Sequence, residues 1–435
     1  MSNAGFDRPP GLMSSVRRPG GVPSRSALSP GMSRLLILRV ATVANVVVSM
    51  SNFHEALLPP SLSSLQQYAG IALWLVTIWV ALGMKPVLER SVSTDAWAVV
   101  IFYGFAIISV LWSDLSISSV MKAAALFVTS TGAFMLVTRL DLQDIIFDVN
   151  IGLLVLTVAS IMVVVTLPDI GVSQEWSHEG NWQGVFVSKQ SLGVLGGIAM
   201  FFSAYLGLTR GRSWLFAVCF VLAAACAFGS ESRGGGALAL LACVCVFFAG
   251  RSRGVAKALA FAPLAILLVA TAMIAYLYAT GEDAFDISGT RIDFTERTFI
   301  WQYALAHFDE RPILGFGING FWTNGDLYGA FERSHGWVLD DFHSGYVAIL
   351  TETGLVGYAA FSVCTLLFGV RLAASIEEGT MARSRVVALI GFMTLIYMID
   401  LTETIFLRST SFMSTLIPAF LFNSSMPTAG PEASS

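Results

Sequence analysis

The chain has 435 residues, of which 55% are apolar and only 12% are charged, and its formal net charge is -4. Water-soluble domains carry about a quarter charged residues, so the composition excludes an ordinary soluble protein. A near-neutral charge gives no reason to expect nucleic acid as a partner. All five cysteines lie inside apolar runs, which favours small buried side chains over a disulfide framework or a zinc site.

The two ends of the chain differ in composition from the middle. Residues 1–34 are rich in Ser, Pro, Gly and Arg and contain no apolar segment, so we expect a disordered cytoplasmic tail and not a signal peptide. Residues 423–435 have a similar character, and we expect a second disordered cytoplasmic tail there. A transmembrane domain is then predicted over residues 35–422.

Apolar runs of about the length that crosses a hydrocarbon core recur along this domain. Their number predicts an all-α polytopic membrane protein with about twelve transmembrane helices. The predicted spans are 35–53, 67–83, 96–113, 119–138, 145–167, 191–208, 213–229, 235–249, 258–279, 345–370, 386–401 and 410–422.

The orientation of the spans follows from Lys and Arg in the short loops, because cytoplasmic loops carry an excess of these residues. One set of alternate loops and the N-terminal tail collect them, which places both termini in the cytoplasm of a bacterium and the chain in its inner membrane. These cations are Arg8, Arg17, Arg18, Arg25, Arg34, Lys85, Arg90, Arg139, Arg210, Arg212, Arg251, Arg253, Lys257, Arg371, Arg383 and Arg385.

The outward loop 280–344 is much longer than the usual connection between packed spans, so we expect it to carry function. An apolar stripe over residues 295–308 predicts a short interfacial helix, which Arg311-Pro312 ends. Glycines at 315, 317 and 320 then predict a tight turn that packs on the membrane. As a phosphate loop this GFGING run is weak, because no strand precedes it and no GK[ST] follows.

Several motifs in this half of the chain resemble the O-antigen ligase and polysaccharide polymerase superfamily. Their order, spacing and common outward location carry the resemblance. At Gln190 and Ser344 the sequence departs from the family, which commonly has Asn at both positions. The motifs are GVFVSKQSLG from Gly184, SRGGGALAL from Ser232, the pair Arg297 and Trp301, RPILGFGINGFW from Arg311, and FHSGYVAILTETGLVG from Phe342 to Gly357.

The resemblance implies a GT-C-like glycosyltransferase with a large periplasmic loop. Its implied reaction is transfer of a glycan from an undecaprenyl diphosphate carrier to an acceptor hydroxyl, without cofactor or metal. The segment GFGINGFWT resembles exopolysaccharide polymerases of the succinoglycan type more than lipopolysaccharide ligases. The implied partners are the carrier-linked oligosaccharide, membrane lipids, and either an acceptor glycan or lipid A core.

Three cations are the candidate ligands of the donor diphosphate that the resemblance implies: Arg233, Arg297 and Lys189. A guanidinium matches phosphate oxygens bidentately, and the three glycines after Arg233 allow a large head group to come close. The structural alternatives are a snorkelling side chain at Arg233, a cation resting on Trp301 at Arg297, and an interfacial anchor at Lys189.

His343 is the candidate general base, because imidazole titrates near neutral pH and can take a proton from a sugar hydroxyl. His335 in the same loop is its rival, and His178 lies in another outward loop. Asp341 and the neighbouring Asp340 either orient the imidazole or are simply solvated. The histidines are too scattered in sequence to predict a metal site.

Acidic residues within or beside the spans require partners in the bundle. Glu352 lies too deep to share the task of His343, so we expect a structural partner for it; Arg39 and Asp400 are candidates to pair with each other. A secondary transporter or lipid-linked oligosaccharide flippase is the competing hypothesis. It would show two similar halves and broken helices at the midplane, and no internal repeat is evident.

Overall fold

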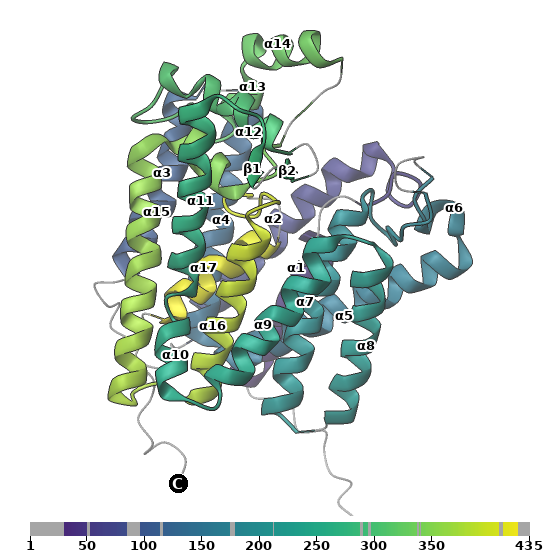
Figure 1. The fold of residues 1–435 in the computed structure, drawn as a ribbon. Helices are drawn as coiled ribbons and strands as arrows, with labels where there is room; N and C mark the ends of the chain where they lie inside the picture. The colour runs from purple at the N-terminus through teal and green to yellow at the C-terminus, as the bar shows by residue number, and fades with distance from the viewer. Residues whose placement is uncertain are drawn as a thin grey trace, which may run out of the picture.

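The structure is a computed structural model that describes residues 30–49, 53–84, 96–113, 116–174, 179–211, 213–287, 290–294, 297–336, 339, 341–408 and 412–424. The described residues are mostly helical (Figure 1). The α-helices are α1 (Pro30–Ser49), α2 (Pro60–Leu82), α3 (Ala96–Ile108), α4 (Ile117–Arg139), α5 (Leu142–Thr166), α6 (Pro168–Gly171), α7 (Lys189–Thr209), α8 (Ser213–Gly229), α9 (Arg233–Ala249), α10 (Arg253–Leu259), α11 (Ala262–Thr280), α12 (Arg297–Ala306), α13 (Gly320–Thr323), α14 (Gly325–His335), α15 (Gly345–Glu378), α16 (Arg383–Ile399) and α17 (Phe412–Ser424).

Each predicted span overlaps one of these helices, so hydropathy located them correctly. Six segments are long and apolar enough to cross a membrane, and four shorter apolar helices accompany them. The protein is therefore a multi-pass helical membrane protein, while a total of twelve crossings stays a prediction. The six segments are Met32–Ser49, Ile117–Arg139, Leu142–Thr166, Lys189–Thr209, Arg253–Thr280 and Gly345–Glu378.

Two local features depart from the predicted boundaries. Helix α1 begins at Pro30, before the boundary predicted at residue 35, and the remainder of both predicted tails lies outside the described residues. The long loop also contains a small antiparallel hairpin of β1 (Phe285–Ile287) and β2 (Thr290–Ile292), which the all-α prediction did not include.

Two basic residues of the predicted cytoplasmic turns bind neighbouring helices. Arg139 donates to the carbonyl of Ala81 at 2.8 Å, and Lys257 pairs with Glu377 at the last turn of α15. Figure 1 shows α10 at this lower end and α12, α13 and α14 at the opposite end. The long loop thus lies at the opposite end of the bundle from the basic turn at α10, and which end faces the cytoplasm stays a prediction.

The candidate ion pair between Arg39 and Asp400 does not form. Arg39 binds Asp148 of α5, with 2.7 Å from Nη2 to Oδ1, and its Nη1 lies 3.6 Å from Asp144. Asp400 instead accepts hydrogen bonds from backbone amides of the segment that follows it. Arg39 is therefore paired with acids of α5, as a charge near the hydrocarbon region requires, and Asp400 bonds to backbone amides through Oδ1.

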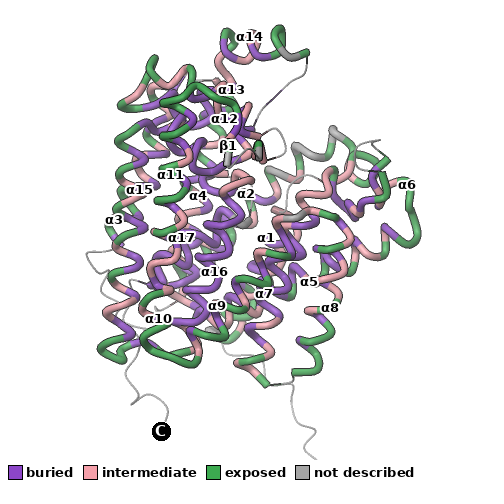
Figure 2. The backbone as a smooth tube through the Cα atoms, in the orientation of Figure 1, coloured by how far each residue is buried: buried purple, intermediate pink, exposed green. Residues whose placement is uncertain are grey.

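Burial separates an inner layer of helices from an outer one (Figure 2). Every residue of α16 from Val386 to Ile399 is buried. Large apolar side chains on outer helices are exposed instead, such as Trp79 at 76% and Trp214 at 71%. An exposed apolar surface of this kind is expected where helices face lipid.

The apolar stripe predicted as an interfacial helix forms α12, but it packs inside the protein. Trp301 and Leu305 are 3% and 2% exposed. The ring of Tyr303 stacks on Trp322 and meets Phe331 of α14 edge-on. Aromatic residues of α13 and α14 therefore cover part of the apolar face from which an interfacial helix was predicted.

Helix α15 is broken at Gly354, whose φ of 64° is accessible to glycine at low cost. Residues 312–317 supply backbone partners at the break: Gly317 N donates to Glu352 O at 2.8 Å, and Leu355 N donates to Pro312 O at 2.9 Å. A Cβ on Gly315 or Gly354 would collide with this backbone. The glycine turn therefore packs into the break of α15, a partner that the prediction did not name.

Glu352 has the structural partner that was expected. Its Oε1 accepts a hydrogen bond from the backbone amide of Asn319 at 3.0 Å. Asn319 has a left-handed backbone with φ 58°, and its side-chain oxygen accepts from Lys122 of α4. These bonds tie the glycine turn, α4 and α15 together.

Candidate functional site

The segment 400–408, which follows α16, is anchored on the first residue of α15. Gly345 N donates to the carbonyls of Asp400 and Glu403 at 2.9 and 3.1 Å. The Oδ1 atom of the fully buried Asp400 accepts from Ile405 N at 2.6 Å and from Phe406 N at 3.3 Å. These bonds fix the backbone from Asp400 to Phe406, and with it the position from which the Glu403 side chain extends.

Three helices begin around this segment. The first residue of α15 bonds to the carbonyls of Asp400 and Glu403. Helix α12 begins with Arg297, which donates to the carbonyl of Thr402. At the start of α9, a Cβ on Gly234 would lie 4.0 Å from Thr402 Oγ1. Helix N-termini carry partial positive charge and free amides, so their convergence favours an anionic ligand.

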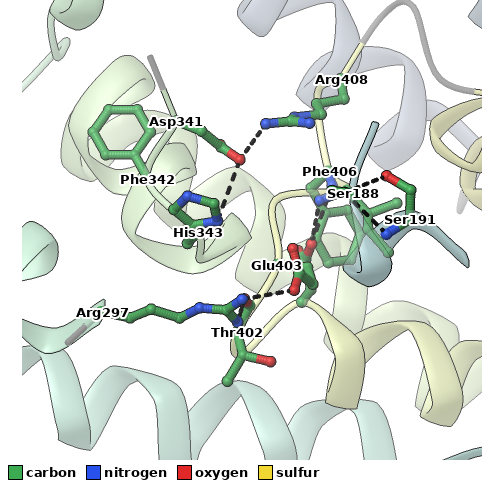
Figure 3. A network of polar contacts seen from close by, with 12 residues as sticks. Ser188, Ser191, Arg297, Asp341, Phe342, His343, Thr402, Glu403, Phe406 and Arg408 are labelled. Carbon is green, nitrogen blue, oxygen red and sulfur yellow. Dashed lines mark hydrogen bonds and ion pairs between the residues drawn. The ribbon is translucent and has the colours of Figure 1, made fainter. Parts of the chain in front are cut away.

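Arg297 is held by the segment on two sides. Its Nη1 donates to the carbonyl of Thr402, and its Nη2 lies 2.9 Å from Glu403 Oε1 (Figure 3). The two charged side chains are 17% and 21% exposed. The alternative contact with Trp301 is replaced by this ion pair, since the Trp301 indole is directed to the chain before α15.

His343 lies two residues before α15 in a left-handed conformation with φ 50°. Trp301 Nε1 donates to the carbonyl of Phe342 at 3.0 Å and so holds the residue next to the imidazole. Asp341 Oδ2 lies 3.8 Å from His343 Nδ1 (Figure 3). Trp301 and Asp341, both predicted as supporting residues, therefore lie beside His343.

Asp341 also forms a close ion pair with Arg408 at the far end of the segment. Burial alone would raise the pKa of Asp341. The charges of Arg408 and His343, with the contact from Arg408, outweigh that effect and hold the pKa below its ordinary value. Asp341 is therefore an ionised carboxylate that faces two basic side chains.

Lys189 is the first residue of α7, whose N-cap Ser188 accepts from Ser191 N at 3.3 Å. With the Asn181 amide oriented to satisfy both neighbours, its oxygen accepts from Lys189 Nζ and its nitrogen donates to Glu231, each at 2.9 Å. Lys189 is thus linked to the turn that precedes Arg233. Close packing of Gly193 and Gly197 of α7 against residues 230–235 brings the two motifs together.

For four of the predicted residues, the structure does not describe the side chain or the whole residue. Arg233 begins α9 and His335 ends α14, but their side chains are not described, and Asp340 and His178 lie outside the described residues. Among the residues that are described, no three His, Cys, Asp or Glu side chains are grouped so that they could hold a metal ion.

Sequence reasoning missed Arg408 and did not assign Glu403 to the site. Both lie in the short segment between the last two predicted spans, outside the long loop and outside the family motifs. A signal was available, because Glu403 and Arg408 carry opposite charges in a connection of only a few residues between two apolar runs.

Two comparisons bear on the family. Residues 218–362 match the O-antigen ligase family. The chain is also similar to the exopolysaccharide production protein ExoQ of Rhizobium meliloti (strain 1021), with 26% identity over 211 residues. That match covers 43% of this chain and 46% of the relative, so it spans about half the length of each. The resemblance to the superfamily is confirmed, and the matched residues 218–362 include Arg233, Arg297 and His343.

Proposed function

We propose that the protein is a glycosyltransferase of the bacterial inner membrane that polymerises exopolysaccharide. It takes glycan from undecaprenyl diphosphate and transfers it to an acceptor hydroxyl of another glycan. One observation carries the proposal: the start of α9, Arg297 of α12 and His343 before α15 meet along the segment 402–408. In this proposal the long loop faces the periplasm and both termini face the cytoplasm, in line with the basic loops at the opposite end.

Arg297 is the donor ligand in this proposal, together with Arg233 and Lys189. Its planar guanidinium can hold two phosphate oxygens at once, and the neighbouring helix N-termini add partial positive charge. These groups would stabilise the negative charge that develops on the diphosphate as it leaves. They would also orient the anomeric carbon toward the acceptor.

His343 is the proposed general base. The acceptor oxygen forms a bond to the anomeric carbon while its proton passes to the imidazole. The bond from that carbon to the phosphate oxygen breaks, and undecaprenyl diphosphate leaves with the electron pair. Asp341, 3.8 Å from Nδ1, would stabilise the imidazolium that forms, and Trp301 would hold its backbone.

Two alternatives have an observation in their favour. The family description names O-antigen ligases, which supports attachment of the glycan to lipid A core. The break in α15 is a feature of transporters and flippases. In this protein, however, backbone atoms of residues 312–317 bond to the broken ends. That filling favours a rigid joint over a transport site.

The test of the proposal is reconstitution of the purified chain in phospholipid vesicles with undecaprenyl diphosphate-linked repeats. A polymerase yields a ladder of longer carrier-linked glycans without lipid A core. A ligase yields product only when lipid A core is added. Movement of unchanged carrier-linked repeats across the vesicle membrane, with no new glycosidic bond, would overturn the proposal in favour of a flippase.

A further inference from the structure

Two ion pairs of opposite polarity join the segment 400–408 to the long loop. In one, Arg297 of the loop side binds Glu403 of the segment; in the other, Asp341 of the loop side binds Arg408 of the segment (Figure 3). Each guanidinium is therefore neutralised by a carboxylate. A phosphate group that binds both terminal nitrogens of Arg297 must take the place of Glu403 at Nη2 and of the Thr402 carbonyl at Nη1, and Glu403 is the charged one of the two.

The two carboxylates differ in how readily a ligand can replace them. Asp341 is 11% exposed and faces both Arg408 and His343, so its removal would leave two basic groups without their acid. Glu403 is 21% exposed and pairs with Arg297. Its backbone carbonyl is held by Gly345 N at 3.1 Å, so the side chain can turn away while the segment keeps its place.

A membrane presents a selection problem to an arginine that binds lipid phosphate. Phospholipids vastly outnumber any carrier lipid, and each offers a phosphodiester group to an open guanidinium. A carboxylate of the protein that occupies the guanidinium lowers the affinity for every anionic ligand. Specificity is often gained in this way, because the ligand with fewer favourable contacts no longer binds. A diphosphate bears more charge than a phosphodiester and reaches more donors, so it is better able to displace the carboxylate.

We infer that Glu403 is a specificity-determining residue: it occupies Arg297 until a lipid diphosphate displaces it, and it excludes lipids that carry a single phosphate. The inference rests on the proposed function, because it concerns the same donor site. It adds a requirement that the proposed function does not contain, namely that removal of an acid from the site broadens lipid binding.

The experiment measures lipid binding to the full chain in nanodiscs of zwitterionic phosphatidylcholine. The probes are undecaprenyl diphosphate and undecaprenyl phosphate, which share one tail and differ in head group. The variant is Glu403→Gln, which keeps the shape and removes the charge. The matched control is Glu310→Gln, which removes an acid of the long loop that pairs with His307 at 2.6 Å.

For Glu403→Gln we expect undecaprenyl phosphate to bind more tightly by a factor of about 5 to 30, which corresponds to ~1–2 kcal/mol. Undecaprenyl diphosphate should gain less, so the ratio of the two affinities falls. Glu403→Asp retains the charge on a shorter side chain and should fall between wild type and Gln. The control should bind both lipids as the wild type does.

Each other outcome contradicts a defined part of the account. If the wild type binds the diphosphate but Glu403→Gln leaves the affinity ratio unchanged, or weakens both lipids, Glu403 is a structural partner of Arg297 and the inference fails alone. A folded Glu403→Asp variant with the wild-type ratio has the same meaning if the Gln variant does not fold. If the wild type binds neither lipid, the proposed function fails and the inference fails with it.

Discussion

Trp301 holds the residue before His343, because its indole donates a hydrogen bond to the carbonyl of Phe342 at 3.0 Å. The bond runs from the first helix of the long loop to the residue before the imidazole. Because His343 has a left-handed backbone, its side-chain direction depends on neighbours that hold the chain in this conformation. Trp301 is therefore a positioning residue in the proposed reaction.

Trp301→Phe tests this role, because it keeps an aromatic ring and removes the donor. We expect glycan transfer to fall about 10- to 100-fold, as small displacements of catalytic groups typically do, with donor binding retained. The control is Trp112→Phe, which removes a similar 3.0 Å bond to the carbonyl of Leu314 at the glycine turn. Equal losses in both variants would mean that the effect is general destabilisation.

Replacement of Arg297 by Lys retains the charge and loses the fork. We expect transfer to fall by roughly tenfold or more, because charge-assisted bonds are lost, while the protein still inserts in the membrane. Arg233→Lys should act in the same direction. The control Arg291→Lys alters an exposed pair with Asp283 in the same loop and should leave transfer unchanged. Normal transfer in both site variants would identify the two arginines as anchors.

The lowered pKa of Asp341 gives a pH dependence of stability with a defined sign. A carboxyl whose pKa is lower in the folded state stabilises that state above its ordinary pKa, and the contribution is lost as pH falls through the folded value. Asp341→Asn should therefore lower the melting temperature at pH 7, and the difference from wild type should shrink in acid. Thermal unfolding in detergent from pH 7 downward measures this, and a difference that grows in acid would contradict it.

The position of the long loop opposite the basic turns predicts the accessibility of single cysteines. In a variant without the native cysteines, a cysteine at Asp326 of α14 should react with an impermeant reagent added to intact cells from the periplasmic side. A cysteine at Gly254 of α10 should react only after the membrane is permeabilised. The reverse pattern would invert the orientation and place the site in the cytoplasm.

Hydropathy was sufficient to locate the helices, because apolar runs of spanning length have few alternatives to helix. It did not reveal which apolar face meets protein and which meets lipid. For that reason the stripe of α12 was assigned to the membrane surface, whereas Trp301 and Leu305 are buried and Tyr303 packs on Trp322 of α13 and Phe331 of α14. The packing partner of the glycine turn could not be predicted either, because it is a break in α15 at Gly354, which is distant in sequence.

The site was predictable where a motif marks it and not where only tertiary contact does. Arg297 and His343 were found from the family motifs and Asp341 from its place beside His343, and the three lie together in the structure. Their partners Glu403 and Arg408 come from a segment beyond the motifs, which the fold brings back to the start of α15. Opposite charges in such a short connection were visible, but their pairing required the arrangement of α12, α15 and α16.

The most direct test of the central claim combines two readings on purified protein in vesicles: new glycosidic bonds and released undecaprenyl diphosphate. The wild type should produce both in equal amounts. His343→Ala should lower both together, by the ~100- to 10,000-fold that general base catalysis contributes, without a matching loss of donor binding. His335→Ala should do much less. Full activity in His343→Ala, or equal loss in both histidine variants, would contradict the assignment of His343 as the base of a glycan transfer reaction.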